Sequence, residues 1–71
     1  MAHKTLKLTN VKPKKNVVRF DYYADDVERE DQKPVLVSSI YVHKDKAKEE
    51  LGVKNLAKVA GVEVTIRIIK E

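Results

Sequence analysis

Cationic and aromatic side chains are the residues of this chain most suited to binding. Alternation along the predicted strands gives six of them one outward parity: Lys7, Arg19, Tyr23, Tyr41, His43 and Arg67. Lysine and arginine contact phosphates, and bases stack on aromatic rings for about 1–3 kcal/mol each. If the strands pair as one sheet, this face is suited to single-stranded nucleic acid. The alternative is that the tyrosines pack across neighbouring strands and the charges only solvate the sheet.

Three further lysines lie around Pro13 in a short polar stretch: Lys12, Lys14 and Lys15. A basic turn adds affinity for phosphates without choosing a base sequence. The alternative is a solvated turn, in which lysines also discourage edge-to-edge association of strands. With the six residues on the outward face, these lysines complete the predicted nucleic-acid-binding set.

No residue pattern indicates catalysis or metal binding. The chain has no cysteine, and only His3 and His43 offer imidazole ligands. The acids of residues 25–31 lack the spacing of a calcium loop, and Ser38 and Ser39 stand outside any nucleophile turn. Two glycines are too few for a phosphate-binding loop. We therefore expect a binding module that is not an enzyme and uses no cofactor or metal.

Basic and acidic residues are segregated along the chain. Residues 1–20 carry six lysines or arginines and no acid, whereas residues 21–31 carry six acids and one arginine. The net charge of +4 and the pI near 9.4 favour an anionic partner. Between residues 24 and 33 only Ala24 and Val27 are apolar, too few to offset the entropy of ordering. We predict a mobile acidic loop over residues 24–34.

Alternation of polar and apolar residues predicts four strands. They cover residues 5–9, 17–23, 35–43 and 62–69. The first two are expected to pair as a hairpin, because Asn10, Pro13 and a polar turn separate them. Residues 35–43 are apolar on both parities, which is typical of a central strand or of one that faces a partner.

A helical segment is expected between the third and fourth strands. Asp45 is predicted to cap a helix that ends before Gly52. Residues 53–60 repeat apolar side chains at helical spacing, which predicts either two short helical turns or one helix broken at Gly52. The order β-β-β-α-β predicts a single α+β domain over residues 1–71, a small and mostly antiparallel sheet or partly open barrel with one short or broken helix.

The length of the chain favours association. A domain of 71 residues buries only about 60% of the surface that its unfolded chain exposes, so its core is thin. Dimerisation is one remedy. Apolar residues on both sides of the predicted sheet fit an alternative function, a protein-interaction or self-associating module: Val35, Val37, Tyr41 and Ile69.

Nothing in the sequence predicts a membrane or a small molecule as partner. No apolar run reaches the 18 or so residues that a membrane span needs, and the basic N-terminus lacks the apolar stretch of a signal peptide. A chain without cysteine fits a reducing compartment, so we predict a cytoplasmic location. A small domain also has little volume for a substrate pocket.

Several of these strand sequences resemble a pattern of small uncharacterised bacterial and phage proteins. Residues 15–20 read K-N-V-V-R-F, an acidic loop follows, and residues 41–44 and 62–66 read Y-V-H-K and V-E-V-T-I. The similar proteins have a K-N-x-V-R-[FY] strand, an acidic turn, a Y-[VI]-x-K strand and a terminal V-x-V-T-I strand. The chain departs from them by a longer helical insert between Lys44 and Val62. The resemblance implies the strand order and carries no activity or site residue.

Overall fold

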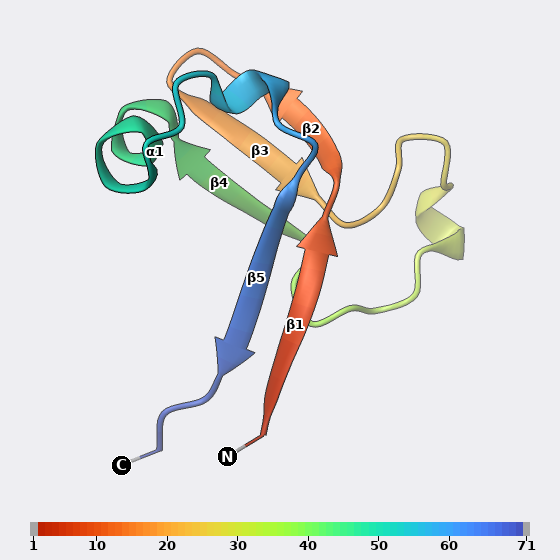
Figure 1. The fold of residues 1–71 in the computed structure, drawn as a ribbon. Coiled ribbons are helices and arrows are strands. Elements are labelled where there is room, and N and C mark those ends of the chain that lie inside the picture. Colours follow the sequence, from red (N-terminus) through yellow and green to blue (C-terminus); the bar gives the residue numbers. More distant parts are fainter. Residues whose placement is uncertain (1, 71) are drawn as a thin grey trace.

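The computed structural model of the protein describes residues 2–70 (Figure 1). These residues form strands β1 (His3–Leu8), β2 (Asn10–Pro13), β3 (Val17–Asp21), β4 (Ser39–His43) and β5 (Val62–Arg67), helix α1 (Lys44–Leu51), and 3-10 turns η1 (Arg29–Asp31) and η2 (Leu56–Lys58). The strands make two antiparallel sheets, β1-β5 and β2-β3-β4. The predicted α+β class is confirmed, and the described strands do not close into a barrel.

The two sheets share one core, which their inner faces enclose. Its buried apolar side chains come from both sheets and from the helical segments: Leu6, Leu8, Val18, Phe20, Ala47 and Leu56. Strand alternation explains this set, because Leu6 and Leu8 share one parity of β1, and Val18 and Phe20 share one parity of β3. The outer faces of the two sheets therefore lie on opposite sides of the core.

The expected hairpin between residues 5–9 and 17–23 is wrong. β3 pairs with β2, the stretch that Asn10 and Pro13 were expected to interrupt, and β1 pairs with β5. Pro13 is tolerated because β2 is an edge strand and Pro13 is its last residue. The Lys14 N–H donates to the Val17 carbonyl at 2.8 Å, which closes the turn between β2 and β3.

The strand expected over residues 35–43 is confirmed only from Ser39 onward, and it lies at the edge of its sheet rather than at the centre. β4 is shorter than predicted because its partner strand, β3, ends at Asp21 instead of Tyr23. The Tyr22 N–H still donates to the Ser38 carbonyl at 2.9 Å, but the chain then bends away. Residues 35–37 are left without a strand to pair with.

The helical segment ends as predicted and begins differently. Gly52 adopts a left-handed conformation, with φ of 69°, and its N–H caps α1. Residue 43, not Asp45, occupies the N-cap position, and no side chain caps this end. Asp45 instead lies in the first turn, where a carboxylate interacts favourably with the helix dipole. Of the two alternatives for residues 53–60, the separate helical turn is confirmed, as η2.

The lower part of the β1-β5 ribbon extends beyond the three-stranded sheet (Figure 1). We call this part, His3–Thr5 paired with Thr65–Arg67, the arm. The molecule has extents of 38 × 32 × 17 Å and a radius of gyration of 13.6 Å. A compact chain of this length has a radius of gyration of about 11 Å. No helix within residues 2–70 is long and apolar enough to span a membrane.

Candidate binding surfaces

The outer face of β2-β3-β4 presents side chains in rows that cross the strands. Lys12, Arg19 and Tyr41 are direct neighbours in one row. Asn10, Asp21 and Ser39 form another. The Tyr41 side chain is 61% exposed beside the guanidinium of Arg19. Part of the predicted cation and aromatic surface is therefore assembled on this sheet.

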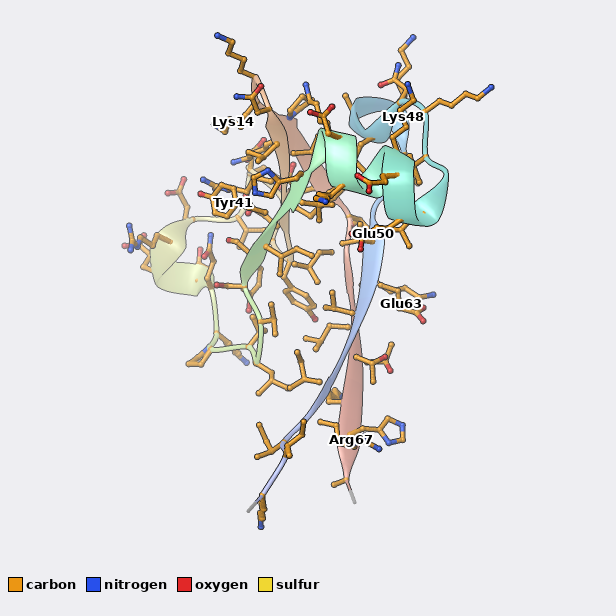
Figure 2. All side chains as sticks on the ribbon, turned by 90° about the vertical axis from the view of Figure 1, so that its left-hand side faces the viewer. Lys14, Tyr41, Lys48, Glu50, Glu63 and Arg67 are labelled. Atoms are coloured by element: carbon orange, nitrogen blue, oxygen red, sulfur yellow. The ribbon has the colours of Figure 1, made fainter. Side chains whose placement is uncertain are left out.

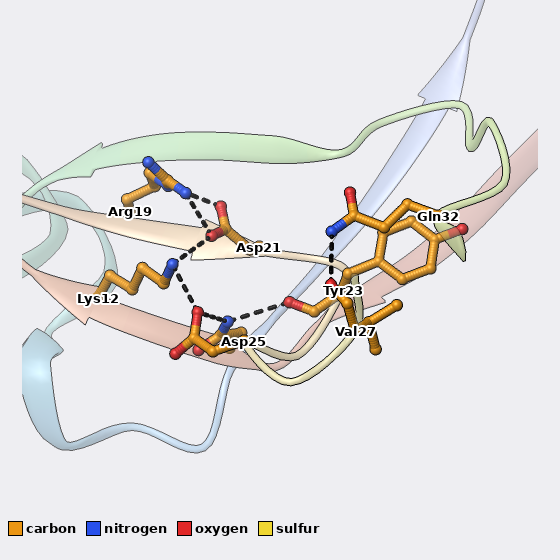
Figure 3. A network of polar contacts seen from close by, with 8 residues as sticks. Lys12, Arg19, Asp21, Tyr23, Asp25, Val27 and Gln32 are labelled. Atoms are coloured by element: carbon orange, nitrogen blue, oxygen red, sulfur yellow. Dashed lines mark hydrogen bonds and ion pairs between the residues drawn. The ribbon is translucent and has the colours of Figure 1, made fainter. Parts of the chain in front are cut away.

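Asp21 is the centre of the polar contacts on this face (Figure 3). Arg19 donates two hydrogen bonds to its carboxylate, from Nε at 2.8 Å and from Nη2 at 2.7 Å. The Lys12 ammonium lies 3.4 Å from Asp21 and 2.7 Å from Asp25. Asp21 is only 7% exposed, so its negative charge is largely removed from water and is compensated by these cations.

These contacts shift the pKa values of the groups involved. Hydrogen bonds from Arg19 lower the pKa of Asp21 from 3.8 to about 2, against the opposing effect of burial. The same contact raises the pKa of Arg19. The hydrogen bond between Lys12 and Asp25 raises the pKa of the lysine and lowers that of the carboxyl. All four groups are thus charged at neutral pH.

The start of the acidic loop is tied to this network. The Asn10 side-chain amide donates to the Tyr23 carbonyl at 3.0 Å and to Asp25 Oδ1 at 3.1 Å. Further along, the Tyr23 hydroxyl donates to the Lys33 carbonyl, and the Gln32 amide donates to the Val27 carbonyl at 3.2 Å. These bonds define the path of the loop, whose mobility stays a prediction.

A groove of about 510 Å³ lies between the acidic loop and the outer face of β2-β3-β4. Its charged lining combines three cations with three carboxylates: Lys12, Arg19, Arg29, Asp21, Asp25 and Glu28. The groove is therefore nearly neutral rather than positive. Within residues 2–70, no three His, Asp or Glu side chains are grouped so that they could hold a metal ion.

The predicted set of nine residues does not lie on one face. Lys7 and Arg67 lie on the outer face of β1-β5, across from Glu63 and His3. Figure 2 shows Tyr41 on one side of the molecule and Arg67 on the other. The sequence could not reveal this separation, because it depends on β5 pairing with β1 rather than joining one common sheet.

The remaining predicted residues lie near the ends of β3. Tyr23 is half-buried, and its ring packs edge-to-face on Tyr22 with centroids 5.0 Å apart. His43 is exposed on the same outer face as Tyr41, in the row at the far end of the sheet, across from Val17. Lys14 and Lys15 are exposed in the adjoining turn. A hydrogen bond from the Lys44 N–H to the Asn16 carbonyl, at 3.0 Å, connects this turn to the start of α1. Lysines thus gather at the end of β3 opposite the acidic loop.

Exposed apolar side chains form a second type of surface. Of the four predicted interface residues, Tyr41 and Ile69 are exposed, whereas Val35 and Val37 are half-buried and Val37 packs against the core. Sequence reasoning missed Ile68, which is 63% exposed just beyond β5. The sequence did contain a signal for this residue, because the apolar alternation of Val62, Val64 and Ile66 continues to Ile68. At Ile68 the core no longer covers the side chain.

Comparisons with known proteins add no further site. No family model, curated protein or solved structure matches the chain.

Proposed function

We propose that this protein is a non-enzymatic binding module whose main partners are protein surfaces. The observation that supports this function is the exposed area. The chain exposes 6069 Å² of accessible surface. A globular monomer of 8.1 kDa is expected to expose about 4,500 Å². A folded domain with this excess gains stability when a partner covers part of it.

Electrostatics on the outer face of β2-β3-β4 favour the same choice. Arg19 and Lys12 already pair with carboxylates of the chain itself. A phosphate that approached them would have to compete with Asp21 and Asp25 and would meet the acidic loop. A protein partner, with both signs of charge on its surface, meets no such general repulsion.

Photo-crosslinking in the cells that encode the protein tests this function. p-Benzoylphenylalanine would replace Ile68, Tyr41 or, as a control, Lys54 on the segment between α1 and η2. Protein adducts from Ile68 or Tyr41, with few from Lys54, are the expected result whatever the identity of the partner. Adducts only to nucleic acid, or equal yields from all three positions, would contradict it.

A second candidate function is single-stranded nucleic acid binding, which the cross-strand pair of Arg19 and Tyr41 favours. An exposed ring beside a guanidinium is suited to stacking a base while a cation contacts the phosphate. Lys14 and Lys15 would add phosphate contacts from the adjoining turn.

Fluorescence anisotropy separates this candidate from the first. Single-stranded and duplex oligonucleotides would be titrated with the protein at about 50 and 200 mM salt, where phosphate-dependent binding differs strongly. Tyr41→Ala should weaken binding about fivefold or more, whereas Lys54→Ala should have little effect. Absence of binding even at low salt, or equal effects of the two substitutions, would eliminate nucleic acid as the partner.

A further inference from the structure

The arm has an apolar inner face that the rest of residues 2–70 covers only in part. Val62 and Val64 on the inner face of β5 pack against the core, whereas Ile66, next in the same row, is half-buried without being part of that packing. Ile68 continues the row and is largely exposed. A two-stranded ribbon without a covering layer is marginally stable in water. The inner face of the arm therefore presents the kind of exposed apolar surface that one side of an interface has.

We propose that a second copy of this chain covers the inner face of the arm, so that two arms pack face to face in a symmetric homodimer. This inference rests on the proposed protein-binding function and names its partner. Sheets pack face to face at about 10 Å, a distance that interdigitating isoleucines fill. In a twofold arrangement the row of Ile66 and Ile68 would meet the same row of the other copy.

The area available matches what a stable dimer needs. The chain exposes about 1,600 Å² more than a globular monomer of its mass. A standard interface buries about 800 Å² on each partner. The excess of the whole chain is therefore large enough for one such interface, to which the exposed arm would contribute.

Charges favour the face over the edges of the arm. Lys4 on β1 and Arg67 on β5 oppose the addition of another strand along either edge. On the inner face, Lys4 lies directly across from Ile66. Its aliphatic stem extends the apolar surface while its ammonium group reaches water. The distribution of charge thus permits face-to-face packing and discourages growth into a larger sheet.

The opposite charges of the two ends of β3 also suit a pair of identical chains. Lysines surround the Val17 end, and the acidic loop follows the Asp21 end. A twofold arrangement in which the β3 strands run antiparallel would place unlike ends near each other and would offset the repulsion between two molecules of charge +4. A uniformly basic protein would lack this compensation.

Sedimentation equilibrium over a wide range of protein concentrations tests the dimer. The mass should rise from that of one chain to that of two, and Ile68→Asp should weaken association about tenfold or more. Ile69→Asp is the matched control, because Ile69 is the neighbouring isoleucine, is 83% exposed and faces the groove on the outer side with Thr65 and Arg67. A single-chain mass at every concentration, or equal effects of the two substitutions, would overturn the proposal.

Disulfide trapping gives an independent test, since the chain has no cysteine. Ile68→Cys should form an intermolecular disulfide under mild oxidation, whereas Thr65→Cys, on the outer face, should not. Equal trapping at both positions would overturn the dimer. Crosslinks from Ile68 only to a different protein would also overturn it, but would leave the proposed protein-binding function intact.

Discussion

Asp21 shows how one carboxylate can organise a sheet face. It lies on the central strand β3 and contacts a cation on its own strand, Arg19, and one on the neighbouring strand, Lys12. Through Lys12 the network reaches Asp25 in the acidic loop. Because the Asp21 carboxylate is buried, its contribution to the stability of the fold depends on both cations remaining in place.

Replacement of Asp21 by Asn should lower the free energy of unfolding by about 1–3 kcal/mol, because Arg19 and Lys12 would lose their shared partner. Urea denaturation measures this change. Asp26→Asn removes the same charge from an exposed neighbouring position and serves as the control, with an expected change below about 0.5 kcal/mol. Equal losses from both substitutions would show that only net charge matters.

Stability should also depend on pH through Asp21. Its pKa is about 2 in the folded protein and 3.8 ordinarily, so the unfolded chain binds the proton first as pH falls. The stabilisation is complete above about pH 4 and is lost progressively toward pH 2. It amounts to about 1–2 kcal/mol, reduced by solvent around the partly exposed Lys12 and Arg19. Urea denaturation between pH 2 and 6 should show a smaller decrease for Asp21→Asn than for the unmodified chain.

At the scale of elements, Gly61 controls how the end of η2 connects to β5. A Cβ atom at this position would lie 2.6 Å from the Leu8 carbonyl oxygen and 2.9 Å from the Thr9 Cα, both backbone atoms. The chain therefore passes over the junction of β1 and β2 at a distance that only glycine permits. That junction is where the two sheets separate.

Gly61→Ala should destabilise the protein by more than about 2 kcal/mol, because the backbone of β1 or β5 must shift. Gly52→Ala makes the matched comparison. Its Cβ would meet open space, and the cost of about 1–2 kcal/mol would come only from the left-handed conformation. Thermal and urea denaturation of both variants measure the difference. A larger loss for Gly52→Ala would contradict the close approach at Gly61.

Elements defined by local patterns could be predicted from the sequence, and those defined by distant partners could not. The alternation that begins at Val62 and the glycine that ends α1 are both local patterns. The glycine prediction is confirmed, and the strand predicted over residues 62–69 is confirmed from Val62 to Arg67. The length of β4 depends on where β3 bends, and the pairing of β1 depends on β5. Neither dependence is visible in a single strand's composition.

The candidate surface was predictable to the same extent. Strand parity correctly grouped Arg19 with Tyr41, since both lie on the outer side of adjacent strands. It could not place Lys7 and Arg67 on the opposite side of the core, nor identify Asp21 as the carboxylate that pairs with Arg19. Both facts require knowledge of which strands are neighbours in space.

At the scale of the whole molecule, stability rests on few side chains. Leu8, Val18 and Phe20 are the largest fully buried side chains of the described part of the chain. They come from the two sheets, so the same contacts hold the sheets together. A domain this small has little stability to spare when one of them is truncated.

Leu8→Ala should lower the free energy of unfolding by about 2–5 kcal/mol, because it leaves a cavity between the two sheets. Leu51→Ala makes the same chemical change at a side chain that is 73% exposed at the end of α1, and should cost less than about 1 kcal/mol. Urea denaturation with circular dichroism as the readout compares them. Similar losses would mean that Leu8 is not part of the shared core.

The pairing of His3 with Arg67 brings the beginning of β1 beside the end of β5, so the two ends of the described chain emerge together from the arm (Figure 1). A short glycine and serine linker could therefore join the ends, and new ends could be opened in the exposed loop after Tyr23 without cutting a strand. Such a circular permutant would keep both sheets. A tag fused before β1 or after β5 would project from the arm, so affinity tags are better carried by the loop.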